Sequence, residues 1–133
     1  MAHDPHSEPG VVSKLSPRPV PETVERLTGM IAAHGMTLFA VIDQRAAAAT
    51  AGLDLRATTL VMFGSPAAGT PVMAAAPLAA LDLPLKVLVW DDGGQTQVSY
   101  VDPATLADRH YLSAGLAARL AGIGPLIDAL VAP

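Results

Sequence analysis

The sequence predicts a single α+β domain built on an antiparallel sheet of about five strands. The chain has 133 residues, which is the length of one domain. Five short apolar segments have the composition of strands, and two of them flank Asp91-Asp92-Gly93-Gly94, a strong hairpin signal that forces an antiparallel pair. The helical segments are too few to supply a crossover between every pair of strands.

The first third of the chain predicts one strand and one long helix. Residues 1–9 hold two prolines and no apolar periodicity, so we expect a flexible lead-in before a domain over 10–133. A strand is expected over 11–15. Pro21 suits the first turn of a helix, and apolar residues then recur at helical spacing until Gly35, which is placed to end the helix.

The middle of the chain predicts two further strands separated by a short helix. The strands are expected over 37–42 and 58–63, and the alanine-rich segment 45–51 is expected to be helical. Residues 64–69 are predicted to form a loop. Thr70-Pro71 then has the composition of an N-cap followed by the first residue of a helix.

The last third predicts the hairpin and then helices. Its strands are expected over 85–90 and 97–101. Asp102-Pro103 repeats the cap-plus-proline pattern, which predicts a helix over 103–110. Apolar residues recur at helical spacing over 116–131, in a stretch that glycine and proline divide into two pieces.

Composition excludes several classes of protein. Apolar residues make up 51% of the chain and charged residues 15%, with a net charge of −4, which argues against disorder and against nucleic acid as a partner. The absence of cysteine removes disulfides and thiolate metal sites. The uncharged run 57–81 is interrupted by glycine and proline, so no membrane-spanning helix is expected. The N-terminus lacks the pattern of a signal peptide, which favours a cytoplasmic protein.

The strands carry large apolar residues on both faces. Leu85, Val87 and Val89 alternate with Leu88 and Trp90, whereas a sheet with one wet face alternates apolar with polar residues. Helices can cover one face, so something must cover the other. We favour a second copy of the chain, which predicts a homodimer. The alternative is that the C-terminal helix and the central loop cover that face within one monomer.

The loop 64–71, G-S-P-A-A-G-T-P, has the glycine spacing of a phosphate-binding loop. Thr70 replaces the lysine that would reach the phosphates, and Pro71 replaces the hydroxyl that would hold magnesium, so a nucleotide triphosphatase is not expected. Backbone amides and the Thr70 hydroxyl can hold a small anion there, or Thr70 can simply cap a tight turn. We expect no cofactor.

His110 has acidic neighbours in sequence, Asp102 and Asp108, and Tyr100 lies at the end of the adjoining strand. The histidine can act as a structural residue at the helix C-terminus, as a ligand-binding residue or as a general base. A metal site needs three or four grouped ligands, which the sequence does not show, so none is expected.

Five segments together resemble one known family. They are F-G-S-P (63–66), G-T-P-V-M (69–73), L-D-L-P-L-K-V-L-V-W (81–90), V-S-Y-V-D-P (98–103) and L-A-D-R-H (106–110). In this order and spacing they resemble the bacterial and archaeal family called domain of unknown function 302. The resemblance implies a curved antiparallel sheet with helices on one side, similar to TATA-binding-protein-like folds, and a homodimer. It implies no activity.

The chain departs from the family pattern at three positions. The family commonly has asparagine at the positions of Ser65 and Val101, and histidine at that of Gln44. A site that used histidines at both 44 and 110 would have lost one of them here. The candidate ligand-binding residues are Ser65, Gly69, Thr70, Tyr100, Asp102 and His110.

Three classes of function follow. The first is a small dimeric domain that binds a small anionic molecule near the 64–71 loop and the 100–110 segment. The second is an interaction or structural module without a ligand. The third, least favoured because few side chains remain for chemistry, is an enzyme that uses His110 as a general base.

Overall fold

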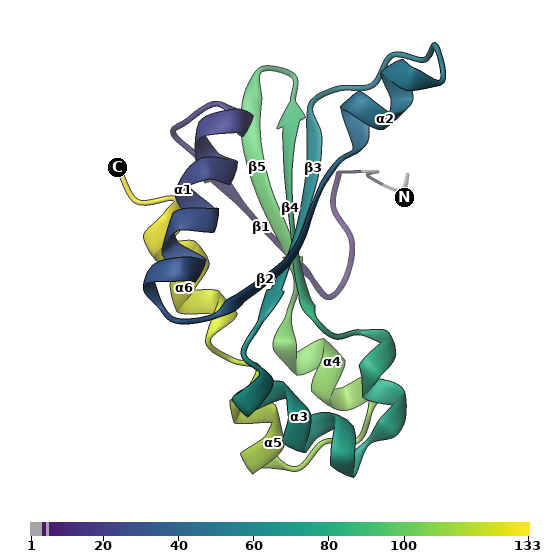
Figure 1. Ribbon diagram of the computed structural model, residues 1–133, viewed down its shortest axis with the longest axis vertical. Helices are drawn as coiled ribbons and strands as arrows, with labels where there is room; N and C mark the ends of the chain where they lie inside the picture. The colour runs from purple at the N-terminus through teal and green to yellow at the C-terminus, as the bar shows by residue number, and fades with distance from the viewer. Residues whose placement is uncertain (1–3, 5) are drawn as a thin grey trace.

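The structure is a computed structural model that describes residue 4 and residues 6–133. Its centre is one five-stranded antiparallel sheet in the order β1-β5-β4-β3-β2, which confirms the predicted fold class (Figure 1). Residues 1–3 and 5 of the predicted lead-in lie outside the described residues. The strands are β1 (Val11–Ser16), β2 (Thr37–Asp43), β3 (Thr58–Gly64), β4 (Leu85–Asp92) and β5 (Gln95–Val101).

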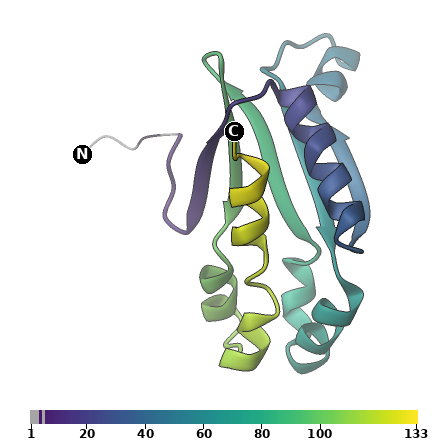
Figure 2. The ribbon, with the colours of Figure 1, turned by 90° about the vertical axis from the view of Figure 1, so that its left-hand side faces the viewer.

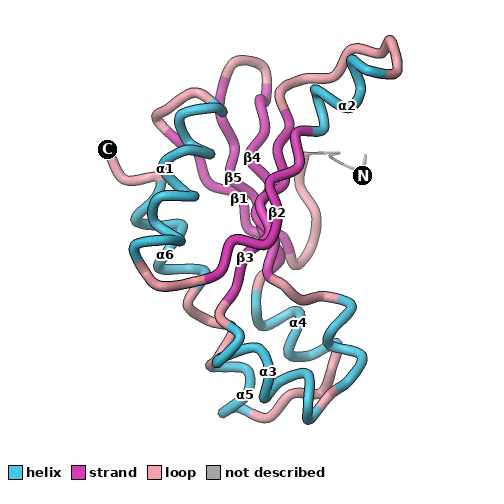
Figure 3. Tube along the Cα trace, in the orientation of Figure 1, coloured by secondary structure: helices cyan, strands magenta, loops and turns pink. Residues whose placement is uncertain are grey.

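The helices form two groups around the sheet. Two of them, α1 and α6, lie side by side across one face, while α3, α4 and α5 gather at one end and α2 projects near the opposite end (Figures 1 and 2). The tube view shows the same separation of strands from helices (Figure 3). The helices are α1 (Val20–Ala33), α2 (Gln44–Thr50), α3 (Pro66–Ala75), the 3₁₀ helix η1 (Pro77–Leu81), α4 (Pro103–Arg109), α5 (Ala114–Ala118) and α6 (Ile123–Leu130).

The local signals at the element ends mostly act as predicted. Gly35 follows α1 with φ +68°, and Gly93 and Gly94 give the β4–β5 hairpin its turn with φ +60° and +96°. These values are accessible to glycine at little cost. The Asp102 carboxylate accepts a hydrogen bond from the Ala104 amide at 3.0 Å, which confirms it as the N-cap of α4.

The prediction of a loop up to Gly69 and a helix from Thr70 is wrong. The helix α3 begins one Ser/Thr-Pro pair earlier, with Ser65 as N-cap, and the Gly69 amide already donates to the Ser65 carbonyl at 2.8 Å. Pro71 lies inside the helix, where it removes only its own amide bond. The earlier start is stabilised by packing, because Val72 is fully buried.

Two apolar clusters hold the domain together. The larger one fills the space between the sheet and the pair α1–α6, and a smaller one joins α3, η1, α4 and the segment after α5. The fully buried residues of the larger cluster include Leu27, Val61, Val87, Val89, Val98, Ile127 and Leu130. The smaller cluster consists of Val72, Ala79, Leu106 and Leu120.

The second face of the sheet, which we call the open face, carries apolar side chains beside the polar Lys86, Gln97 and Ser99, and it lacks a helix layer. Val87 and Val89 are fully buried under α1 and α6, whereas Leu88 and Trp90 on the opposite side of β4 are only half-buried. Leu60 of β3 pairs with Leu88 on that side. The C-terminal helix α6 packs on the α1 side, so it does not cover the open face as the monomer alternative required.

Candidate functional site

The structure distributes the six predicted site residues over different parts of the molecule. Ser65 and Gly69 line one groove, Tyr100 and Asp102 line a separate cavity, and neither of these contains His110. Thr70 is exposed on α3 and lines neither of them. The 64–71 and 100–110 segments therefore do not form one pocket.

The groove at Ser65 is a mainly apolar site that contains two of the predicted residues, Ser65 and Gly69. It consists of two adjoining cavities of about 210 and 390 Å³. We call them together the Ser65 groove. They share the lining residues Gly64, Ser65, Ala68, Leu85, Arg119 and Leu120.

Apolar side chains make up most of the lining of the Ser65 groove. Phe39 lies toward one end and Met30, Met36 and Phe63 toward the other. His34 also lies at that second end, with its Nδ1 2.7 Å from the Met30 carbonyl oxygen. An apolar cleft with a few polar groups is the usual form of a small-molecule site.

Two polar side chains supply the chemistry of the Ser65 groove. Ser65 is the N-cap of α3, yet its side chain makes no capping hydrogen bond. Arg119, at the C-terminus of α5, forms no ion pair with any of residues 4 and 6–133. The guanidinium and the hydroxyl can therefore both donate to an anionic group. Sequence reasoning missed Arg119, because nothing in its surroundings marks it before the fold brings α5 to α3.

Tyr100 and Asp102 meet in a cavity of about 400 Å³ beside α5 and α6. Tyr100 is 6% exposed, and burial raises the pKa of its hydroxyl. A Cβ at Gly124 would lie 3.8 Å from that hydroxyl, so glycine leaves room there. Asp102 is engaged in capping α4, as expected. These contacts explain both residues as parts of the fold.

His110 forms an ion-pair cluster with a partner that the sequence did not indicate. Its Nε2 lies 2.5 Å from Oδ2 of Asp82, and Arg109 donates to both oxygens of Asp82 at 3.0 and 3.1 Å. Asp102, Asp108 and Tyr100 form no hydrogen bond with the His110 ring among the described residues. The cluster joins the end of η1 to the end of α4, so it stabilises the helical group at the end of the sheet.

The charge state of Asp82 follows from two opposing effects. Burial alone would raise its pKa, but hydrogen bonds from His110 and Arg109, together with the Arg109 charge, hold the pKa below the ordinary 3.8. A carboxylate with a lowered pKa stabilises the folded state above its unfolded pKa, and this contribution disappears as the pH falls through the folded pKa.

We expect Asp82→Asn to lower the free energy of unfolding by about 1–2 kcal/mol at pH 7, because two charge-assisted interactions are lost. The difference from the wild type should shrink as the pH falls below about 4. Urea unfolding of the variant and the wild type at pH 7 and below pH 4 measures this difference in the free energy of unfolding. Asp54→Asn, at an exposed aspartate, is the control and should change nothing. A pH-independent difference would contradict the role of the Asp82 charge.

No group of three or more metal-ligating side chains occurs within the part of the chain that the structure describes. Nor does that part contain a helix with the length and apolar character needed to cross a membrane.

The sheet order, the two helix groups and the single-domain size define a class: a one-domain α+β protein on a five-stranded antiparallel sheet. Residues 12–130 match the family described as "Domain of unknown function DUF302". The chain belongs to this family, as the resemblance in its sequence indicated.

A solved structure and two curated proteins are similar to the chain. The "Crystal structure of uncharacterized conserved protein DUF302 from Bacillus stearothermophilus" superposes with a TM-score of 0.79 at 19% identity, over 93% of this chain and 97% of that one, which shows the shared fold. "Fluoride-specific ion channel FluC 1" of Brucella suis biovar 1 (strain 1330) is 41% identical over 104 residues, which are 77% of this chain and 41% of that protein. "Fluoride-specific ion channel FluC 2" of Brucella melitensis biotype 1 is 41% identical over 77% of this chain and 38% of that protein. The chain spans about two-fifths of the length of these curated relatives.

Proposed function

We propose that this protein is a homodimeric binding domain whose Ser65 groove takes a small amphipathic carboxylate, an anion with a short apolar tail. The observation that carries the proposal is the composition of the groove. Its walls are apolar, and its exposed cation, Arg119, forms no ion pair with a described residue.

The apolar walls and the two polar donors of the Ser65 groove favour an anion that carries an alkyl chain. An inorganic anion would leave the apolar walls in contact with water, whereas an alkyl chain would bury them at about 25 cal/mol per Å². A carboxylate head can accept from the Arg119 guanidinium and from the free Ser65 hydroxyl. This deepens the prediction of a small anionic ligand near residues 64–71, with Ser65 retained and Arg119 added.

The test uses octanoate as probe, with octylamine and acetate as comparisons. Octanoate should raise the melting temperature of the wild type, and Arg119→Gln should weaken octanoate binding about three- to tenfold in calorimetry, because a partly exposed charged hydrogen bond is lost. Arg45→Gln, an exposed arginine that does not line the groove, is the matched control.

Two outcomes would contradict the proposal. Equal stabilisation by octylamine would show that the head-group charge is not recognised. Octanoate binding that is unchanged in Arg119→Gln would place the ligand elsewhere.

The homodimer is the second part of the proposal, and the open face supports it. Leu60, Leu88 and Trp90 are half-buried there, and Ile42 and Leu15 at its two edges are 37% and 53% exposed. Fully burying an exposed side chain of this size contributes about 1.5–3 kcal/mol, and burying the exposed part of these five contributes a share of that at each, which favours association of two copies through this face.

An interaction module remains a second candidate function, and the curated relatives favour it. The similar stretch makes up about two-fifths of proteins named as fluoride-specific ion channels, while the described part of this chain has no membrane-crossing helix. In those proteins the similar stretch would be a domain attached to the rest of the chain, and its open sheet face would bind a partner. This function predicts no response to octanoate.

An enzyme that uses His110 as general base has less support. The His110 Nε2 is engaged by Asp82, which is itself held by Arg109 in a cluster that joins two helical elements. These contacts of His110 and Asp82 stabilise the packing of η1 against α4.

A further inference from the structure

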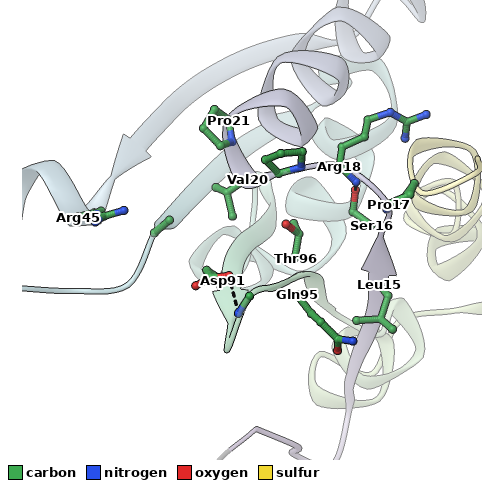
Figure 4. Close-up of a pocket in the computed structure, with 13 residues that line it drawn as sticks. Leu15, Ser16, Pro17, Arg18, Val20, Pro21, Arg45, Asp91, Gln95 and Thr96 are labelled. Carbon is green, nitrogen blue, oxygen red and sulfur yellow. Dashed lines mark hydrogen bonds between the residues drawn. The ribbon is translucent and has the colours of Figure 1, made fainter.

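A further cavity lies at the hairpin end of the sheet (Figure 4). The helices α3 and α5 lie at the opposite end of the molecule (Figure 1). The cavity has a volume of about 520 Å³ and lies between the β1–α1 connection, the β4–β5 hairpin and the start of α2. We call it the hairpin cavity. It shares no lining residue with the Ser65 groove.

The hairpin cavity contains a hydroxyl that has no protein partner among the described residues and is accessible from the cavity. Thr96 of β5 is 7% exposed, and its hydroxyl makes no hydrogen bond with residue 4 or residues 6–133. Figure 4 shows its side chain among the lining residues, with the oxygen directed toward the start of α1. Ser16, which is opposite Thr96 in the sheet, bonds instead to Thr23 at 2.8 Å. The Thr96 hydroxyl is therefore accessible within the cavity and can donate to, or accept from, a ligand.

Positive character comes from two directions. The helix α1 is 14 residues long and begins at Val20 in the cavity wall, and its N-cap, Pro19, offers no side-chain hydrogen bond. The first turn of a helix carries partial positive charge and free amides. Arg45 of α2 also lines the cavity and forms no ion pair with a described residue. The Arg18 guanidinium is directed away from the cavity in Figure 4 and donates to the carbonyls of Leu130 and Ala132, so it offers no contact to a ligand there.

Negative charge lies on the hairpin side of the same cavity. One carboxylate oxygen of Asp91 accepts from the Gly94 amide at 3.1 Å, the dashed bond in Figure 4. The other oxygen has no partner among the described residues and can accept from a ligand. A simple anion would be repelled by this carboxylate, and a simple cation by Arg45 and the α1 N-terminus.

We propose that the hairpin cavity binds a small zwitterion of the α-amino acid type. Its carboxylate accepts from the Thr96 hydroxyl and faces the α1 N-terminus and Arg45, and its ammonium group donates to Asp91. This arrangement gives Thr96, Arg45 and Asp91 each a partner of the complementary kind.

Calorimetry with each proteinogenic amino acid in turn tests the proposal, with propionate and ethylamine as probes that carry one charge only. At least one amino acid should bind, and both single-charge probes should bind more than tenfold more weakly. Thr96→Val keeps the shape and removes the hydroxyl, so it should weaken that amino acid about tenfold or more. Asp91→Asn should weaken it to a similar extent, because the amide can still accept from Gly94 but carries no charge.

The control is Arg119→Gln, which should leave amino acid binding unchanged because Arg119 lies in the Ser65 groove. Failure of octanoate binding and failure of amino acid binding are therefore separate results. The proposal is overturned if no amino acid binds, if propionate binds as tightly as the amino acid, or if Thr96→Val, folded by circular dichroism, binds it as the wild type does.

Discussion

Replacing Leu60 by glutamate is expected to convert the proposed homodimer into a monomer of 13.6 kDa. Leu60 lies in the middle of the open face, where its strand neighbours in register are Leu88 and Ile42. A glutamate there would bring two carboxylates, one from each copy, into the middle of the interface, where Leu88 and Ile42 are the direct neighbours and Lys86 is the nearest cation of the face. Removing a charge from water without a partner costs several kcal/mol, which exceeds what the lost leucine contact contributed.

Sedimentation equilibrium measures this effect. The wild type should give twice the monomer mass at micromolar concentration, and Leu60→Glu should give the monomer mass. Leu53→Glu is the control, because Leu53 is 64% exposed in the connection between α2 and β3 and should leave the mass unchanged.

Trp90 gives a second measurement that needs no substitution. It is the single tryptophan of the chain and lies on the open face, where its Nε1 donates to the Ser99 hydroxyl at 2.9 Å. Dilution of the wild type through the dissociation range should shift Trp90 emission to the red as water reaches the face. A wild type that has the monomer mass at micromolar concentration would end the dimer proposal.

Phe63→Ala is expected to lower the free energy of unfolding by about 3–5 kcal/mol, the second large effect. Phe63 is 1% exposed on β3, belongs to the larger apolar cluster and also lines the Ser65 groove. Its removal leaves a void that the surrounding strands and α1 cannot fill without moving. Denaturant unfolding measures the loss.

The other phenylalanine of the chain is the matched control for Phe63→Ala. Phe39 is 55% exposed on the edge strand β2, so Phe39→Ala should cost less than about 1 kcal/mol. Equal losses for the two variants would contradict the placement of the core on the α1–α6 side.

The strands and the hairpin could be predicted because their signals are local. Alternation of apolar residues identifies a strand, and Gly93-Gly94 supplies the positive φ that the turn needs. The start of α3 could not be predicted in the same way. Ser65-Pro66 and Thr70-Pro71 carry the same local signal, and the burial of Val72 among distant residues accompanies the earlier start.

The contacts within the candidate sites could not be predicted from local sequence signals either. Asp82 is 28 residues from His110 in sequence, and no spacing rule joins an aspartate at the end of η1 to a histidine at the end of α4. Arg119 and Thr96 were likewise not predicted as site residues. An unpaired guanidinium, or a hydroxyl that faces a cavity without a protein partner, is defined only by the neighbours that the fold supplies.

Four features of this protein follow from local sequence: the α+β class, the membership in the family, the element ends set by glycine and proline, and strands with two apolar faces. They follow because helix and strand propensities and the two-residue period of a strand act between residues close together in the chain. Two other features depend on the packed fold. The helix α6 joins α1 on one face and leaves the other open, and the polar groups divide between the Ser65 groove, the hairpin cavity and the Asp82 cluster. Those outcomes depend on contacts between residues far apart in the chain, because packing of the whole core selects one arrangement among several that the local signals allow.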